Sequence, residues 1–170
     1  MSRTVTIFAL LALVSFSASA QQPFQDPLLD RLIGKWVLQG TIGGAATTHD
    51  IESEWVLGHQ YVRLHEVSRE KNADGQAAYE AIVFIGWDQP SGTYACLWLD
   101  STGGGGISAP AIGHAQRSGD DMAFTFKVKD GTSFHTTFAY SRSTDSWQWS
   151  MDGEEGGKLQ PFARVGLTRK

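Results

Sequence analysis

The chain has 170 residues, of which 41% are hydrophobic, 11% aromatic and 19% charged, with 19 glycines, 5 prolines and a single cysteine. This composition excludes a disordered chain, a collagen-like repeat and a small disulfide-stapled scaffold, and the length suits one folded domain. The formal net charge of -4, without any run of like charges, argues against a nucleic-acid-binding surface.

The first twenty residues have the pattern of a secretory signal peptide. Arg3 supplies a positive start, Val5 to Val14 is an apolar stretch, and Ala18-Ser19-Ala20 offers the small residues of a cleavage site. Serines then interrupt the apolar stretch before it reaches the about 20 residues that a membrane-spanning helix needs. We therefore expect cleavage near Ala20, export to the periplasm or the exterior, and a single mature domain of residues 21–170. No later segment is apolar enough to predict a membrane span.

One short helix is predicted at the start of this domain. Asp26 suits the N-cap, Pro27 the first helical position, and Gly34 the stop. The helix would last about two turns. Its apolar residues are Leu28, Leu29, Leu32 and Ile33.

Strand-like runs follow at spacings of about 8 to 12 residues, separated by glycine, aspartate, serine and proline, which is typical of a sandwich or barrel. No shift in composition marks a domain boundary. We expect strands near residues 35–42, 50–57, 60–68, 77–87, 93–99, 111–117, 121–128, 132–140, 146–152 and 160–169.

The turn at Gly58-His59 fixes the register of one predicted hairpin. A two-residue type II′ turn there places Trp55 opposite Val62, so that apolar residues meet on one face. On the other face, acidic residues are predicted to lie opposite basic residues. The pairs expected there are Glu54 with Arg63 and Glu52 with His65.

Further along the chain, aromatic residues decide the register. A three-residue loop of Lys129-Asp130-Gly131, with Gly131 in the left-handed conformation, pairs Phe126 with Phe134. A two-residue Asp-Gly turn would scatter the aromatic residues over both faces. The other pairs expected from loop lengths are Met122 with Phe138, Tyr140 with Trp147, Phe138 with Trp149, Trp87 with Tyr94, Ile85 with Cys96 and Val83 with Trp98.

The strand pair near 77–87 and 93–99 is apolar on both faces. A sheet face that carries such residues on its outer side needs a cover. We expect the short helix, another sheet layer or a second subunit in a homodimer to pack there. The residues concerned are Ile82, Phe84, Leu97 and Leu99.

The start of the first strand carries a known motif. Gly34-Lys35-Trp36 directly follows the capped helix, and a long meander of strands then ends at Arg169. This arrangement resembles the calycin superfamily of lipocalin-like barrels, whose signature is glycine-x-tryptophan. The resemblance implies that Trp36 plugs one end of a barrel and that a late arginine, Arg164 or Arg169, packs over its ring as a cation–π contact.

A closer resemblance is to a family of mostly bacterial, often exported, lipocalin-like proteins catalogued as a domain of unknown function. It implies a barrel and a ligand cavity, and it brings no substrate, cofactor or catalytic residue. The segments that carry it are Leu32-Ile33-Gly34-Lys35-Trp36, Glu54-Trp55-Val56-Leu57-Gly58, Ile85-Gly86-Trp87-Asp88 and Asp100-Ser101-Thr102-Gly103.

The motifs of metal and nucleophile chemistry do not occur in the chain. There is no His-x-His or His-Glu-x-x-His spacing, no Cys-x-x-Cys and no Gly-x-Ser-x-Gly elbow. Cys96 is expected in mid-strand among apolar residues, as an inert core thiol. We therefore expect no metal site, no cofactor and no catalytic residue that a motif can name.

Glu66 is the candidate polar group of the interior. It shares the predicted face of Trp55 and Leu64, where burial would make it a proton donor or a ligand contact, unless it reaches water at the strand end. The pairs of Arg63 and His65 with glutamates either form a polar cluster inside the barrel that orients an anionic head group, or lie solvated outside.

These patterns predict an all-β fold, an antiparallel lipocalin-like (calycin) β-barrel of about 8 to 10 strands with a short N-terminal helix. We expect its interior to bind a small apolar or amphipathic ligand. Two alternatives stay open: a barrel isomerase or hydrolase that uses Glu66 or His65 for proton transfer, and a non-catalytic interaction module of the cell envelope. The aromatic residues either line a pocket or fill a core. The candidate ligand-binding residues are Trp55, Glu66, Trp98, Phe124, Phe126, Phe138 and Trp149.

Overall fold

A computed structural model of the chain describes residues 24–103, 106–128 and 131–170. The expected signal segment, residues 1–20, and Lys129-Asp130 of the predicted loop lie outside these residues. Among the helices of the described ranges, none has the length and apolar character that crossing a membrane requires.

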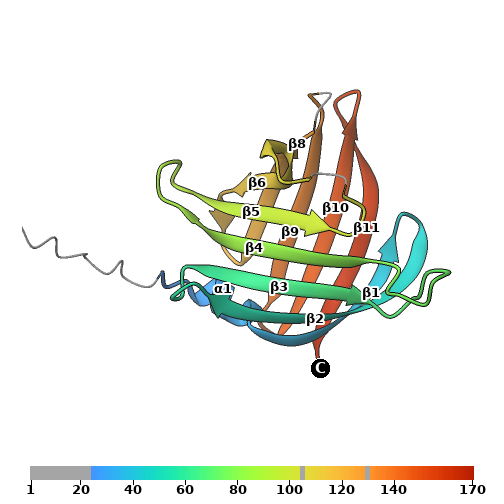
Figure 1. Cartoon of the computed structure of the whole chain (residues 1–170). Coiled ribbons are helices and arrows are strands. Elements are labelled where there is room, and N and C mark those ends of the chain that lie inside the picture. Colours follow the sequence, from blue (N-terminus) through green and yellow to red (C-terminus); the bar gives the residue numbers. More distant parts are fainter. Residues whose placement is uncertain (1–23, 104–105, 129–130) are drawn as a thin grey trace, which may run out of the picture.

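Consecutive antiparallel strands wind round into a barrel (Figure 1). The sheet order is β6-β5-β4-β3-β2-β1-β11-β10-β9-β8-β7, and an additional pairing of β6 with β8 closes a ring of ten strands with β7 outside it. The sequence prediction of an all-β, lipocalin-like barrel with one short helix is therefore confirmed. The strands are β1 (Gly34–Ile42), β2 (Ala45–Val56), β3 (Tyr61–Ser68), β4 (Glu80–Asp88), β5 (Thr93–Asp100), β6 (Ile112–Ala115), β7 (Arg117–Ser118), β8 (Asp121–Lys127), β9 (Ser133–Ser141), β10 (Ser146–Glu155) and β11 (Lys158–Arg169).

Two predicted strands differ most from the structure, while β4 begins three residues later than predicted, at Glu80, and β10 ends three residues later, at Glu155. β2 begins at Ala45 rather than near residue 50, because it continues through the two residues that pair with Thr41 and Ile42 of β1. The strand expected at 111–117 is divided into β6 and β7, after a single 3-10 turn, η1 (Ala109–Ala111). The earlier start of β2 is important for the site, since it adds residues to the barrel interior.

The predicted registers are confirmed for the hairpins of β2 with β3, β4 with β5, β8 with β9 and β9 with β10. Trp55 lies opposite Val62, and Phe126 opposite Phe134. Gly131 has the predicted left-handed φ of 85°. The remaining confirmed pairs are Glu54 with Arg63, Glu52 with His65, Met122 with Phe138, Tyr140 with Trp147, Phe138 with Trp149, Trp87 with Tyr94, Ile85 with Cys96 and Val83 with Trp98.

The turn between β2 and β3 was predicted wrongly. A type II′ turn has positive φ only at its first central residue, whereas φ is positive at both Gly58 (65°) and His59 (67°), and at Leu57 before them (51°). The strands stop at Val56 and Tyr61, so residues 57–60 form a four-residue loop that keeps the same register. Leu57 consequently lies in the loop, 72% exposed, and not on the apolar face.

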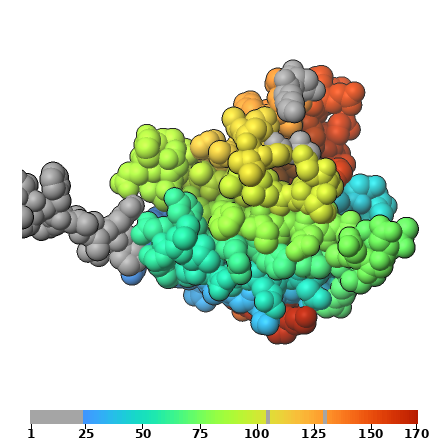
Figure 2. All heavy atoms as spheres, in the orientation of Figure 1, coloured from blue at the N-terminus to red at the C-terminus, as the bar shows by residue number. Residues whose placement is uncertain are grey.

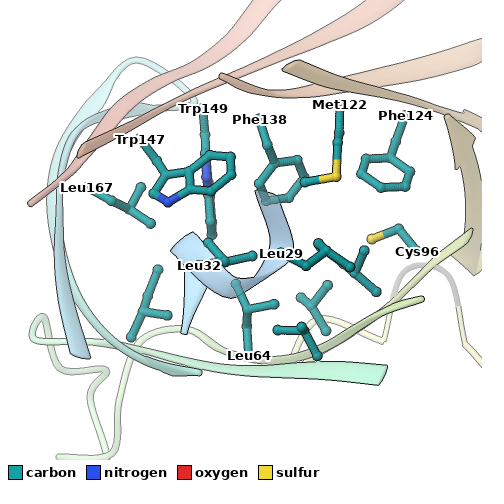
Figure 3. Packing of buried hydrophobic residues seen from close by; sticks show 14 of the residues in the cluster. Leu29, Leu32, Leu64, Cys96, Met122, Phe124, Phe138, Trp147, Trp149 and Leu167 are labelled. Carbon is teal, nitrogen blue, oxygen red and sulfur yellow. The ribbon is translucent and has the colours of Figure 1, made fainter. Parts of the chain in front are cut away.

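Helix α1 (Pro27–Leu32) closes one end of the barrel. Asp26 caps it by accepting hydrogen bonds from the backbone N–H groups of Leu28 (2.7 Å) and Leu29 (3.2 Å), as the sequence predicts. The leucines of α1 are buried in the core, and Figure 3 shows Leu29 and Leu32 among side chains from the surrounding strands. The helix therefore lies in the barrel mouth and does not cover an outer face.

Trp36 plugs the same end. Its side chain is buried and its Nε1 donates to the carbonyl of Leu32 (2.7 Å). Arg169 is the late arginine over its ring, with Cζ 3.8 Å from the ring centroid, and it donates from Nη1 to the carbonyl of Ile33 (2.6 Å). Gly34 has φ of +129°, and a Cβ there would lie 2.6 Å from Arg169 Nη1, so this position requires glycine.

The outer faces of β4 and β5 are apolar, as predicted. Ile82, Phe84, Leu97 and Leu99 are half-buried, and Figure 2 views the molecule from this side. The described residues form one sheet, and α1 lies in the barrel mouth, so neither a second layer nor the helix is the cover. A second subunit in a homodimer stays a prediction.

Candidate functional site

The end of the barrel opposite α1 is hollow. A cavity of about 750 Å³ is lined by the last residues of β1, the first of β2, the ends of β3 and β5, and the strand ends around the β8–β9 hairpin. Since β1 starts beside α1 and ends at the cavity, the two features occupy opposite ends of the barrel. Its apolar wall includes Ile42, Trp98, Phe126, Phe134, Met151 and Phe162.

A buried histidine and a buried glutamate lie side by side in this cavity. His49 comes from β2 and Glu66 from β3, and Nδ1 of the imidazole is hydrogen-bonded to Oε1 of the carboxylate. Glu66 faces Ile51 across the strands, and His49 is two residues from Ile51 on the same face, so strand alternation brings the two side chains together. Both are almost fully buried, His49 at 3% and Glu66 at 2% exposure.

The other side of the imidazole is held by a hydroxyl. Thr47 Oγ1 lies 2.7 Å from His49 Nε2 and donates its single hydrogen to Glu70 Oε2, 3.1 Å away. The hydroxyl therefore accepts from His49, and Nε2 carries a proton. Glu70 is anchored in turn by the backbone N–H of Thr48 (2.9 Å), and hydrogen bonds from backbone N–H groups, its own and that of Thr48, hold the pKa of Glu70 below its usual range.

Tyr79 packs over the histidine. The two rings are stacked, with centroids 5.6 Å apart, and the Tyr79 hydroxyl accepts a hydrogen bond from Nε1 of Trp98 (3.0 Å). Burial, and next the charge of Glu66, raise the pKa of Tyr79 well above its usual range. The phenol therefore stays neutral and keeps its own hydrogen, which makes it a donor on the cavity wall.

One oxygen of Glu66 has no partner. Oε2 is buried and makes no hydrogen bond with any of the residues that the structure describes. A buried carboxylate oxygen without a donor is unfavourable by about 1 to 3 kcal/mol or more. Because Glu66 lines the cavity, a molecule inside it can supply the missing donor.

The charge of the cavity is negative. Its carboxylates belong to Glu66, Glu70 and Asp100, and His49 is the one basic side chain among the described residues that line it. Lysine and arginine are absent from that lining. The site therefore has acceptors in excess of donors.

Three of the seven candidate residues line the cavity, namely Glu66, Trp98 and Phe126. Phe124, Phe138 and Trp149 lie in the core towards α1, and Trp55, which is half-buried, packs against that core. Trp149 stacks edge-on against Trp98 (centroids 6.4 Å apart), and so continues the cavity wall into the filled half of the barrel. Figure 3 shows it there with Phe138 and Phe124. Trp55 donates from Nε1 to Asp30 of α1 (2.9 Å).

The polar pairs predicted on β2 and β3 lie outside the barrel. Arg63 binds Glu54 at 2.5 Å on the outer surface, with the two side chains 42% and 56% exposed, so they form no interior cluster for an anionic head group. His65 binds Glu80 (2.6 Å) rather than Glu52 and does not line the cavity. The outward alternation of β3 is the reason, since it points these residues away from Glu66.

Sequence reasoning missed His49, Thr47 and Tyr79. The signal for His49 was present: the alternation of Ile51 and Trp55, extended back by one step, places His49 on the inner face. It was lost because the strand was expected to begin near residue 50. Tyr79 lies within the strand expected at 77–87, in phase with the inward Val83 and Ile85, but it was not singled out; in the structure β4 begins one residue later, at Glu80.

Within the described ranges, no group of three or more histidine, cysteine, aspartate or glutamate side chains is arranged to hold a metal ion. No protein-family model matches the chain, and no match is found among curated proteins. What the protein does must therefore be argued from the cavity.

Proposed function

We propose that this protein binds a small amphipathic molecule inside its barrel. The apolar body would lie between the aromatic and aliphatic walls, and the polar head would meet the cluster of Thr47, His49, Glu66 and Tyr79. A cavity of about 750 Å³ is within the roughly 300–1,000 Å³ of pockets that hold such ligands. The single observation that carries the proposal is the unpartnered Glu66 Oε2, since it is buried at the polar end of an otherwise apolar cavity.

We also propose, from the sequence, that the chain is exported and belongs to the exported lipocalin-like family that it resembles. The support for this family is the combination of Gly34, Trp36 and Arg169. In the barrel, these three residues lie together at the end that α1 closes.

Native mass spectrometry of the protein purified from its source tests the proposal first. We expect a small molecule to be retained. Titration with an apolar fluorescent probe then tests whether binding occurs in the cavity. Ala45→Trp, at the cavity lining, should weaken probe binding at least about tenfold. Ala123→Trp, on the exposed outer face of β8, should leave probe binding unchanged. Equal binding by both variants, or an empty protein that binds no probe, would favour the interaction module instead.

One observation favours a second function, hydrolysis. Thr47, His49 and Glu66 form a hydroxyl–imidazole–carboxylate line, which is the arrangement of nucleophilic hydrolases. The hydrogen of Thr47 is directed to Glu70, however, and His49 Nε2 is protonated, so the histidine is not placed as the base for this hydroxyl. If the protein hydrolyses an ester and Thr47→Val abolishes the activity, hydrolysis is supported. If Thr47→Val leaves the activity unchanged, Thr47 is not the nucleophile and this catalytic arrangement is excluded.

A further inference from the structure

The chemistry of the polar cluster specifies the head group of the ligand, provided that the proposed binding function is correct. Both ring nitrogens of His49 are already used, Nδ1 by Glu66 and Nε2 by Thr47. Neither can turn to Glu66 Oε2 without losing its present bond. No described residue donates to this oxygen, so a molecule in the cavity can supply the donor.

Charge restricts that molecule further. The proton shared by His49 and Glu66 makes this pair neutral overall, whereas Glu70 and Asp100 add two negative charges to the lining. A carboxylate or phosphate head would meet these charges, of which Glu70 is exposed and Asp100 half-buried, with no lysine or arginine in the described lining to balance it. Anionic ligands are thereby disfavoured.

We propose that the ligand is an amphipathic amine, with an apolar body and a protonated amino group that donates to Glu66 Oε2. An ammonium group has three donors and no acceptor, which matches a site rich in acceptors. Hydrogen bonds between charged partners are about twice as strong as those between neutral ones. The rings of Tyr79 and Trp98 line the same cavity, and aromatic rings attract cations.

Calorimetric titration with three probes of equal chain length tests this inference: decylamine, 1-decanol and decanoate, at neutral pH and low salt. We expect decylamine to bind about ten- to a hundredfold more tightly than 1-decanol, and decanoate to bind more weakly than either. The inference is overturned if 1-decanol or decanoate binds as tightly as decylamine. If none of the three binds, the proposed ligand-binding function itself has failed.

The variant Glu66→Gln tests whether the preference for decylamine depends on this carboxylate. We expect this variant to lose most of the preference for decylamine over 1-decanol, measured as the ratio of the two affinities in the same protein, whereas Glu54→Gln on the outer surface should keep the full preference. A preference that survives in a folded Glu66→Gln protein would contradict the assignment. Should that variant not fold, Glu70→Gln removes one charge from the cavity lining, and it should lower the ratio of decylamine affinity to 1-decanol affinity several-fold; an unchanged ratio would contradict the charge argument.

Discussion

Removing one member of the buried pair of His49 and Glu66 should lower the free energy of unfolding strongly. Replacing both members with apolar residues should lower it only slightly. Glu66→Leu leaves the buried imidazole without its hydrogen-bond partner, and His49→Leu leaves the buried carboxyl group without its partner; both side chains are almost fully buried. Breaking such a pair costs about 3 to 5 kcal/mol, and we expect about 2 to 4 kcal/mol in each single variant because the adjoining cavity can admit water. The double variant loses both charges together and should lose only about 1 kcal/mol, since Thr47 keeps its bond to Glu70.

Urea denaturation followed by near-ultraviolet circular dichroism measures these free energies of unfolding. The expected coupling between the two positions is at least about 2 kcal/mol. The solvated pair of Glu54 and Arg63 is the control, with a coupling of about 0.2 to 1 kcal/mol when both become leucine. Single losses below about 1 kcal/mol that simply add would refute the reasoning. A stable double variant that no longer prefers decylamine would show that the pair is retained for binding rather than for stability.

Three further outcomes are expected. Arg169→Lys should lower the free energy of unfolding by about 1 to 3 kcal/mol, because an ammonium cannot cover the Trp36 ring and reach the helix carbonyls together; an unchanged denaturation midpoint would contradict this. Burial and the hydrogen bond to Asp26 raise the pKa of Tyr94 from 10.0 to about 12, so its contribution to stability is complete below pH 10 and is lost as pH rises to about 12. Tyr94→Phe should lack that alkaline loss, and an unaltered stability profile from pH 9 to 12 would be the contrary result. Burial also raises the pKa of the Cys96 thiol far above its usual range, so a thiol reagent should label it only after unfolding; rapid labelling of the native protein would refute this.

The barrel could be predicted because its signals are local. Alternating residues fix which side of a strand faces inward, and loop lengths fix the partner of each residue, so pairs such as Trp55 with Val62 were correct although the turn type was not. The placement of Glu66 on the inner face follows from the same alternation.

The partners of Glu66 could not be predicted in this way. Its bond to His49 depends on β2 reaching back to Ala45, which β1 decides by continuing to pair as far as Ile42. Alternation along the strand expected at 77–87 gives Tyr79 an inward side chain, but its stacking on His49 depends on how β2 and β4 are placed around the barrel. The exposure of Leu57 likewise depends on where pairing stops, and this is decided by the whole sheet rather than by the turn residues.

By itself, the sequence determined an all-β barrel, the registers of four hairpins, a capped helix before the first strand and the inward phase of Glu66; the tertiary structure decided that this helix closes one end of the barrel and that Glu66 is buried. Only the tertiary structure decided that aromatic residues fill the half beside α1 and leave the other half hollow, so that Phe138 and Trp149 are core and Trp98 and Phe126 are cavity wall. The physical reason is that alternation gives the face of a residue but not its height along the barrel. That height depends on how the strands are staggered around the ring and on which end the helix occupies.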